Sequence, residues 1–184
     1  MTLRPLIAAS LAVLLAACGA PRPTPDRAAV NLPPVETVPE VDLQRYAGKW
    51  FEVAHFPMFF QQQCVSDTTA HYLPDGEGGY EVINRCRTRK GVDEADGSAT
   101  VVPDSGNAKL KISLLWPFRG DYWIIGLHPD YRWAVVGTPD RKYLWVLSRS
   151  PEMPRAELDK ALGIAREQGY DLDKLMYTPH DKGV

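Results

Sequence analysis

From Lys49 onward, the hydrophobic residues recur in short runs that are separated by turn-forming residues. The runs are rich in β-branched and aromatic residues, follow one another about every ten residues, and are bounded by Gly, Pro, Asp or Asn. Many short strands with such turns between them are typical of a β-sandwich or a closed barrel. The predicted strands are residues 50–56, 65–73, 80–88, 98–102, 109–115, 122–127, 133–137 and 143–148.

The alternation within the strands differs along the chain. In "KLKIS", Lys109 and Lys111 share one face, while Leu110 and Ile112 share the other. The segments "YWIIGL" and "WAVVG" are instead apolar on both faces. Because a barrel needs only one apolar face per strand, something else must cover the second face of these strands.

A single amphipathic helix is available for this, within residues 150–171. Its apolar residues recur at helical spacing and form one stripe, which suits packing against the outside of a sheet. Pro151 or Pro154 can open the helix and Gly169 can end it. Residues 172–177 then add a last short strand. The stripe consists of Leu158, Ala161, Leu162 and Ala165.

The first residues form an export signal rather than part of the fold. A positive start at Arg4 precedes an uncharged run, residues 6–17, that is too short to span a bilayer. Cys18 follows "LAA", which resembles the lipobox of bacterial lipoproteins and implies removal of residues 1–17 and acylation of Cys18. Gly19, in place of aspartate, resembles lipoproteins that are sent to the outer membrane. The alternative is an ordinary signal peptide with a cysteine beside its cleavage site.

Residues 18–41 contain six prolines and no apolar periodicity. Such a segment buries too little surface to offset its ordering entropy, which predicts an extended spacer. The remaining residues, 42–184, suit a single domain. The formal net charge of −2 and the pI near 6.1 give no support for nucleic-acid binding.

The two cysteines other than Cys18 lie at the base of one predicted hairpin. The turn-forming "PDGEGG", residues 74–79, joins the second and third predicted strands and places Cys64 near Cys86. In a secreted chain this pair predicts a disulfide. The alternative is two buried thiols. A catalytic Cys64 paired with His71 lacks an oxyanion site and an orienting third group.

Three blocks of sequence resemble the signatures of the lipocalin family. "DLQRYAGKWFEVAHFP" carries the Gly-x-Trp motif at Gly48 and Trp50, and "HPDYRWAVVGTPDRKYLWVLSRSP" carries Asp130, Tyr131 and Arg149. The nearest resemblance is to the bacterial outer-membrane lipocalins and their eukaryotic relatives around apolipoprotein D. It implies an all-β, eight-stranded antiparallel up-and-down barrel with one C-terminal helix packed outside.

The resemblance also gives the signature residues structural roles. Gly48 would turn the chain from a short helical segment, residues 42–46, into the first strand. Trp50 would plug the closed end, with Arg149 across its indole.

Strand parity and the resemblance together predict which residues line the barrel. The interior is expected to be mainly aliphatic and aromatic, which suits an acyl chain from a fatty acid or a lysophospholipid and requires no cofactor. The hairpin adds Ala70, Val82 and Asn84 as further candidates. The predicted ligand-binding residues are Glu52, Ala54, Tyr72, Leu110, Ile112, Tyr122, Ile124, Tyr143, Trp145 and Leu147.

The leading hypothesis is a non-enzymatic lipid carrier or store, held at the outer membrane by Cys18 with its barrel in the periplasm. Two alternatives stay open. One is a lipid-modifying or isoprenoid-modifying enzyme that uses Glu52, His55, Asp67 or His71, and the other is a structural envelope protein with a filled barrel. The histidines, including His128 and His180, are too scattered to predict a metal site.

Two apolar runs suggest further contacts at the barrel mouth. "FPMFF", residues 56–60, and "LLWPF", residues 114–118, could form a lip that touches a membrane or a second copy of the chain in a homodimer. For the first run the alternative is simple packing within the first loop.

Overall fold

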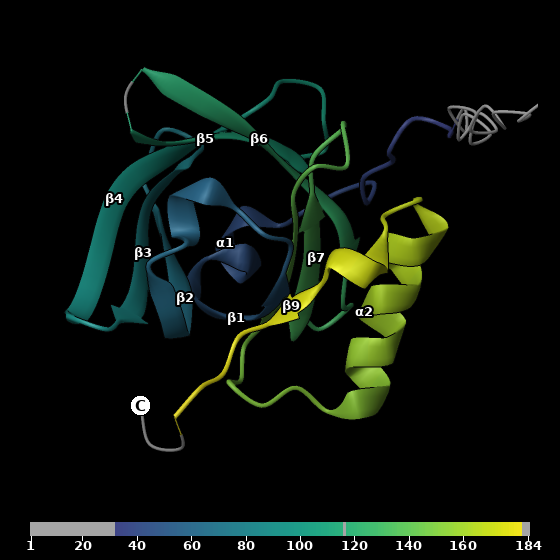
Figure 1. Cartoon of the computed structure of the whole chain (residues 1–184). Coiled ribbons are helices and arrows are strands. Elements are labelled where there is room, and N and C mark those ends of the chain that lie inside the picture. Colours follow the sequence, from purple (N-terminus) through teal and green to yellow (C-terminus); the bar gives the residue numbers. More distant parts are fainter. Residues whose placement is uncertain (1–31, 116, 182–184) are drawn as a thin grey trace, which may run out of the picture. The chain divides into compact units, whose positions relative to one another are not determined.

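The computed structural model describes residues 32–115 and 117–181. Eight antiparallel strands pair in sequence order, and β1 pairs with both β8 and β2, which closes the barrel. Figure 1 looks along the barrel and shows the strands surrounding its centre. The strands are β1 (Gly48–His55), β2 (Cys64–Pro74), β3 (Tyr80–Thr88), β4 (Gly91–Val101), β5 (Lys109–Leu115), β6 (Phe118–Leu127), β7 (Trp133–Gly137) and β8 (Leu144–Ser148).

The predicted up-and-down order is confirmed, and the largest difference in bounds is at β4. The sequence predicts a strand only from Ser98, whereas β4 already begins at Gly91. Residues 91–96 are all exposed, and apart from Val92 they are polar or small, so they show no alternation. Each of them nevertheless pairs with a residue of β3, and these backbone hydrogen bonds extend the strand where the side chains give no signal.

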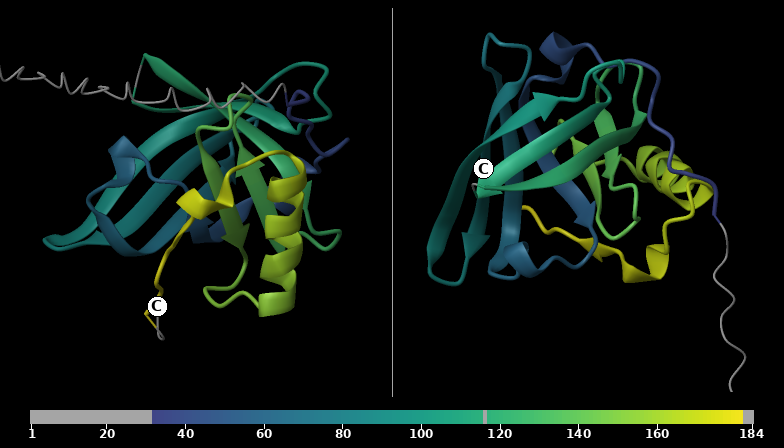
Figure 2. Two further views of the ribbon diagram at one scale, coloured as in Figure 1. Left: turned by 45° about the vertical axis from the view of Figure 1, so that its right-hand side comes forward. Right: turned by 90° about the horizontal axis from the view of Figure 1, so that it is seen from above.

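Two apolar clusters lie on opposite faces of the β6–β8 wall. The inner cluster includes Trp50, Ala134 and Val136, and the outer cluster includes Trp133 and Val135. Helix α2 (Arg155–Glu167) lies along the outside of this wall (Figure 2) and contributes its buried Ala161, Leu162 and Ala165 to the outer cluster. The helix therefore covers the second apolar face, as the sequence predicts.

The ends of α2 follow the predicted signals. Pro154 precedes the first helical residue, where its missing N–H is not needed. Gly169 follows the helix with φ +81°, a conformation that favours glycine.

The closed end is built around Trp50. Helix α1 (Leu43–Tyr46) is capped by Asp42, whose carboxylate accepts hydrogen bonds from the N–H groups of Gln44 and Arg45. Gly48 has φ +92° and turns the chain into β1. The indole of Trp50 is fully buried and donates from Nε1 to the carbonyl oxygen of Tyr46 at 2.8 Å.

Arg149 completes this closed end. Its guanidinium carbon lies 3.8 Å from the centre of the Trp50 ring, and its nitrogens donate to the carbonyl oxygens of Lys49, Arg45 and Tyr46. Tyr131, with φ +56°, accepts a hydrogen bond on its hydroxyl from the N–H of Asp42. The stacking that the resemblance implies is therefore present.

The chain before Asp42 differs from the predicted spacer. Val35 and Val41 are buried, and the N–H groups of Val38 and Val41 donate to the carbonyl oxygens of Ile124 and Gly106. The spacer prediction is therefore wrong for residues 32–41, which pack on the barrel. The sequence does not reveal this packing, because the prolines interrupt the apolar periodicity from which packed segments are predicted. The predicted signal peptide and Cys18 lie outside the described residues.

The C-terminal segment also differs from its prediction. Residues 172–177 form a 3₁₀ turn, η2 (Leu172–Lys174), and only two strand residues, β9 (Met176–Tyr177). Strand β9 pairs with Ala54 and His55 of β1. Within the described residues, no helix is long and apolar enough to cross a membrane.

Candidate ligand-binding site

The floor of the barrel interior is a cluster of tyrosines above Trp50. Tyr72 donates from its hydroxyl to Tyr122 at 2.9 Å, and the hydroxyls of Tyr46 and Tyr122 are 2.6 Å apart. Tyr80 packs edge-on against Tyr72, with ring centres 5.6 Å apart. Burial raises the pKa of Tyr46, Tyr72 and Tyr122 well above the ordinary value, so these hydroxyls stay protonated.

Burial decreases from this floor towards the other end of the barrel. On β5, Leu110 is 1% exposed, whereas Ile112, two residues further on, is only partly buried. On β8, Leu147 is buried, whereas Trp145 is partly buried and Tyr143, before the strand, contacts Trp145. The interior is therefore filled at one end and accessible at the other. Of the predicted lining residues, Tyr72, Leu110, Ile112, Tyr122, Ile124, Trp145 and Leu147 all belong to or pack against the inner cluster.

Ala54 does not face the interior. It belongs to the outer cluster, with residues of α2. The register with β8 shifts between Glu52 and Ala54, so the alternation that starts at Trp50 is broken at this bulge. The parity prediction for Ala54 is therefore wrong, while Glu52 stays opposite Leu147 and shares its inner face.

Glu52 is a buried carboxylate that the protein itself satisfies. It is 4% exposed, and its two oxygens accept hydrogen bonds from Nε2 of Gln61, both at 2.8 Å. Thr178 donates from Oγ1 to Oε1 of Glu52 at 2.6 Å. Nε2 of His55 lies 3.7 Å from the same oxygen. Sequence patterns gave no sign of Gln61 or Thr178, because both come from irregular segments that only the fold brings to Glu52.

The other residues of the predicted catalytic set have different neighbours. Asp67 accepts a hydrogen bond from Nε of Arg87 at 2.9 Å, and His71 lies opposite Lys49 on the neighbouring strand. His180 connects the C-terminal segment to this region, with Nε2 2.7 Å from the carbonyl oxygen of Glu52. No group of three or more His, Cys, Asp or Glu side chains with metal-binding geometry occurs among the described residues.

The first loop divides the run "FPMFF" into two parts. Phe56 and Met58 are buried, whereas Phe59 and Phe60, in the 3₁₀ turn η1 (Phe59–Gln61), are 75% and 44% exposed. Phe60 contacts Tyr143, with ring centres 5.6 Å apart. In the second run, Leu114 packs against the inner cluster, but the side chains of Leu115, Trp116 and Phe118 lie outside the described residues.

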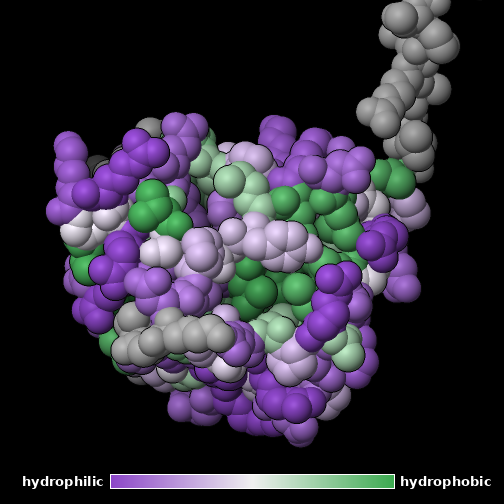
Figure 3. Space-filling model, turned by 60° about the horizontal axis from the view of Figure 1, so that its bottom comes forward, coloured by the Kyte–Doolittle hydropathy of each residue, from purple (hydrophilic) through white to green (hydrophobic). Residues whose placement is uncertain are grey.

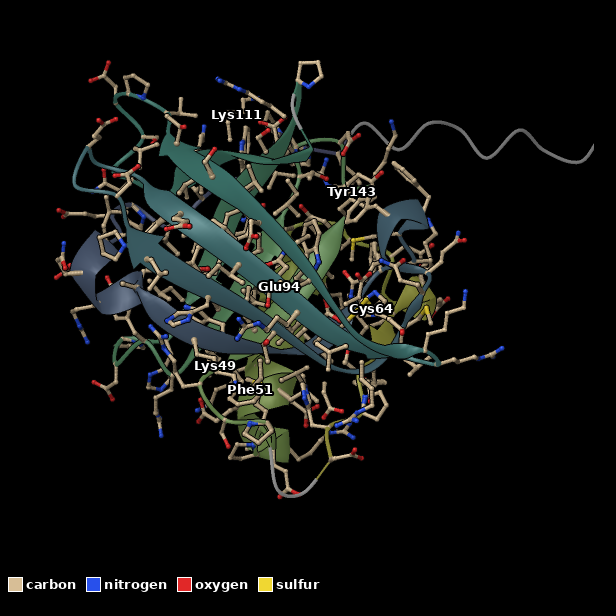
Figure 4. All side chains as sticks on the ribbon, turned by 90° about the vertical axis from the view of Figure 1, so that its left-hand side faces the viewer. Lys49, Phe51, Cys64, Glu94, Lys111 and Tyr143 are labelled. Carbon is tan, nitrogen blue, oxygen red and sulfur yellow. A yellow bond between two sulfur atoms is a disulfide. The ribbon has the colours of Figure 1, made fainter. Side chains whose placement is uncertain are left out.

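The predicted disulfide between Cys64 and Cys86 is confirmed, with Cα atoms 5.5 Å apart. Figure 4 places Cys64 and Tyr143 towards the same end of the barrel, opposite α1. A hollow of about 630 Å³ lies beside the disulfide, between the first loop and the β3–β4 turn. Its lining combines polar, charged and apolar residues: Gln62, Gln63, Val65, Thr88, Arg89, Lys90, Val92 and Asp93.

This architecture defines a class of protein. A closed eight-stranded barrel with a plugged floor and an accessible apolar interior is the form of barrel that holds one small ligand. The chain belongs to the lipocalin family, since the family described as Lipocalin-like domain matches residues 41–180.

The relatives agree with this assignment. The outer membrane lipoprotein Blc of Escherichia coli K12 is 36% identical over 181 residues, which are 97% of each chain. Bovine apolipoprotein D is 26% identical over 157 residues, 79% of each chain. Among solved structures, insecticyanin from Manduca sexta has a TM-score of 0.69 at 21% identity and covers 82% of this chain and 87% of its own. This last likeness supports the fold.

Proposed function

We propose that this protein binds a hydrophobic lipid, a fatty acid or a lysophospholipid, in its barrel and stores or transports it. The observation that carries this proposal is the decrease in burial along an apolar interior, from Leu110 and Leu147 to Ile112, Trp145 and Tyr143. An acyl chain in this space would replace water on apolar surface, at about 25 cal/mol per Å².

Acylation of Cys18 would hold the protein at the outer membrane, with the barrel in the periplasm. The "LAAC" sequence supports this, together with the relatives that are named outer membrane lipoproteins. The disulfide also suits an oxidising compartment.

The mouth is the face that would meet the membrane or a second copy of the chain. Figure 3 shows hydrophobic residues gathered near the middle of one face, framed by hydrophilic ones. Large hydrophobic side chains are exposed in the first loop, at the start of β2, at the β3–β4 turn and in β9, all at the end opposite α1. They are Phe59, Phe60, Val65, Val92, Met176 and Tyr177.

A binding role needs no catalytic group. The hydrogen bonds around Glu52 support a structural role for this carboxylate. Both oxygens of this carboxylate are engaged by Gln61, and one also by Thr178, so it fixes the first loop and the C-terminal segment to β1. A lipid hydrolase that depends on Glu52 would lose turnover in Glu52→Gln. We expect no such turnover in the unmodified protein, measured on a fluorogenic fatty-acid ester.

The decisive experiment compares the same substitution, tryptophan to alanine, at one interior position and one outer position. Trp145 lies on the interior, whereas Trp123 packs against the outer cluster with the amine of Lys109 over its ring. We expect Trp145→Ala to weaken the binding of a fatty acid roughly tenfold, or 1.4 kcal/mol, and Trp123→Ala to leave it unchanged. Displacement of a fluorescent fatty acid measures both affinities without using the substituted indoles as the signal.

Solvent extraction of the purified protein supplies a second readout. It should release a fatty acid or lysophospholipid in the unmodified protein and less of it in Trp145→Ala. Equal affinity in the two tryptophan variants, with no extractable lipid, would contradict the proposal and favour a filled structural barrel.

A further inference from the structure

Asn84 is a polar residue on the interior wall. The pairing of β3 with β4 is regular from Tyr80 to Thr88, so Asn84 faces the same side as Tyr80 and Val82, both of which belong to the inner cluster. The neighbouring side chains on the outer face, Arg85 and Arg87, are exposed. Asn84 therefore points towards the interior.

The side chain of Asn84 has no protein partner. Its Oδ1 is buried and makes no hydrogen bond with any described residue, and it is the one buried side-chain polar atom among them in this state. Its Nδ2 likewise makes no hydrogen bond within the described part of the chain. A buried polar group without a partner costs free energy, so such a group in a native protein calls for an explanation.

The residues paired with Asn84 on either side have small side chains. Ala70 of β2 and Ala95 of β4 are its direct partners across the sheet. Both have only a methyl side chain, and Ala95 is exposed although it lies on the inner face. A ligand that enters the barrel at this level would therefore have only methyl groups on either side of the amide across the sheet.

The position of Asn84 limits which part of a ligand reaches it. Tyr72 and Val82, the next inward-facing pair towards the floor, are buried. Thr88, where β3 ends at the mouth, is four residues away, which corresponds to roughly 13 Å along a strand. The amide thus lies part of the way down the interior, below the disulfide.

We propose that Asn84 determines ligand specificity by binding a group that both donates and accepts a hydrogen bond, such as a hydroxyl on the lipid. This rests on the proposed lipid-binding function and deepens it. A carboxylate or an ester carbonyl only accepts, so it would pair with Nδ2 and leave Oδ1 without a partner. A hydroxyl can donate to Oδ1 and accept from Nδ2.

The hydroxyl can come from the acyl chain or from a small head group that enters the barrel. Two matched pairs of probes separate these sources: 12-hydroxystearate with stearate, and monooleoylglycerol with methyl oleate. In the unmodified protein, we expect the hydroxylated member of at least one pair to bind about tenfold more tightly. Displacement of a fluorescent fatty acid measures all four affinities.

The test variant is Asn84→Leu, which keeps the size of the side chain and removes both polar atoms. We expect it to lose the preference for the hydroxylated probe while binding the plain probe at least as well. The control is Arg85→Gln, next to it on the outer face, which should keep the preference. If Asn84→Leu does not fold, Asn84→Ala makes the same comparison.

The outcomes separate the two proposals. If no probe binds the unmodified protein, the proposed function fails. If all probes bind but neither pair shows a preference, or if the preference survives in Asn84→Leu, the inference about Asn84 is wrong and the lipid-binding function stands.

Discussion

The two ends of the barrel use the same kinds of side chain in opposite ways. At the closed end, Trp50 is fully buried, the ring of Tyr46 packs against it, and Arg149 stacks on its indole. At the open end, Phe59 is largely exposed and Trp145 is only partly buried. Aromatic residues therefore fill space at one end and line accessible space at the other.

The difference shows how the molecule separates stability from binding. The hydroxyls and the guanidinium of the closed end have partners within the protein. The open half holds Asn84, whose amide has no protein partner. Substitutions at the closed end should therefore reduce the free energy of unfolding, and substitutions near the mouth should change ligand binding.

The sharpest test of this separation is Trp50→Ala. Removing a fully buried tryptophan should lower the free energy of unfolding by about 3–5 kcal/mol. Trp145→Ala should cost less than about half of that, because its side chain is only partly buried. Urea unfolding followed by circular dichroism measures both. Equal losses would mean that the open end is packed as tightly as the closed end.

The disulfide should give the largest contribution to stability at the open end. It joins Cys64 to Cys86, 22 residues apart, and closes the β2–β3 hairpin at the mouth. Replacing both residues with serine should lower the free energy of unfolding by about 3 kcal/mol, chiefly through the unfolded chain. Unfolding with and without a reductant provides the control, because only the unmodified protein should respond to it.

A pair of tyrosines isolates the hydroxyls of the two ends. Tyr122→Phe removes the hydroxyl that accepts from Tyr72 and bonds to Tyr46, and so leaves two buried hydroxyls with fewer partners. We expect a loss of about 1–3 kcal/mol. Tyr143→Phe, at the mouth, should change stability by less than about 0.5 kcal/mol. A large loss in Tyr143→Phe would place it in the packed core.

Most of the closed end could be predicted from the sequence. Trp50 and Arg149 were recognisable from motifs, and the outer position of α2 followed from apolar residues on both faces of residues 122–127 and 133–137. The roles of Trp50 and Arg149 came from the resemblance to the lipocalin signatures, whereas the position of α2 came from local periodicity, which the chain carries directly.

The open end was less predictable because its contacts are long-range and irregular. The bulge after Glu52 reverses the alternation and moves Ala54 to the outer face. Gln61, from the first loop, and Thr178, from the C-terminal segment, donate hydrogen bonds to Glu52. No periodic pattern in the sequence predicts such long-range contacts.

The smallest expected effect is a loss of stability at low pH, and it concerns Asp67, which holds the C-terminal segment at the mouth. Asp67 accepts hydrogen bonds from Arg87, from Ser66 and from the N–H of Asp181. Its own N–H donates to the carbonyl oxygen of Pro179. Burial alone would raise the pKa of Asp67, but these hydrogen bonds outweigh it and lower the pKa from 3.8 to about 2.

Because the folded pKa lies below the ordinary value, the contribution of Asp67 is fully present above about pH 4 and is lost as the pH falls towards 2. We expect this loss to be on the order of 1 kcal/mol, since Arg87 is half exposed and water screens the pair. Asp67→Asn should remove this part of the pH dependence, and asparagine tolerates the φ of +56° at this position. Asp96→Asn, on the exposed outer face of β4, is the control and should keep it. Unfolding free energies measured between pH 6 and pH 2 decide the matter: the same acid dependence in both variants would show that Asp67 does not hold the C-terminal segment to the mouth.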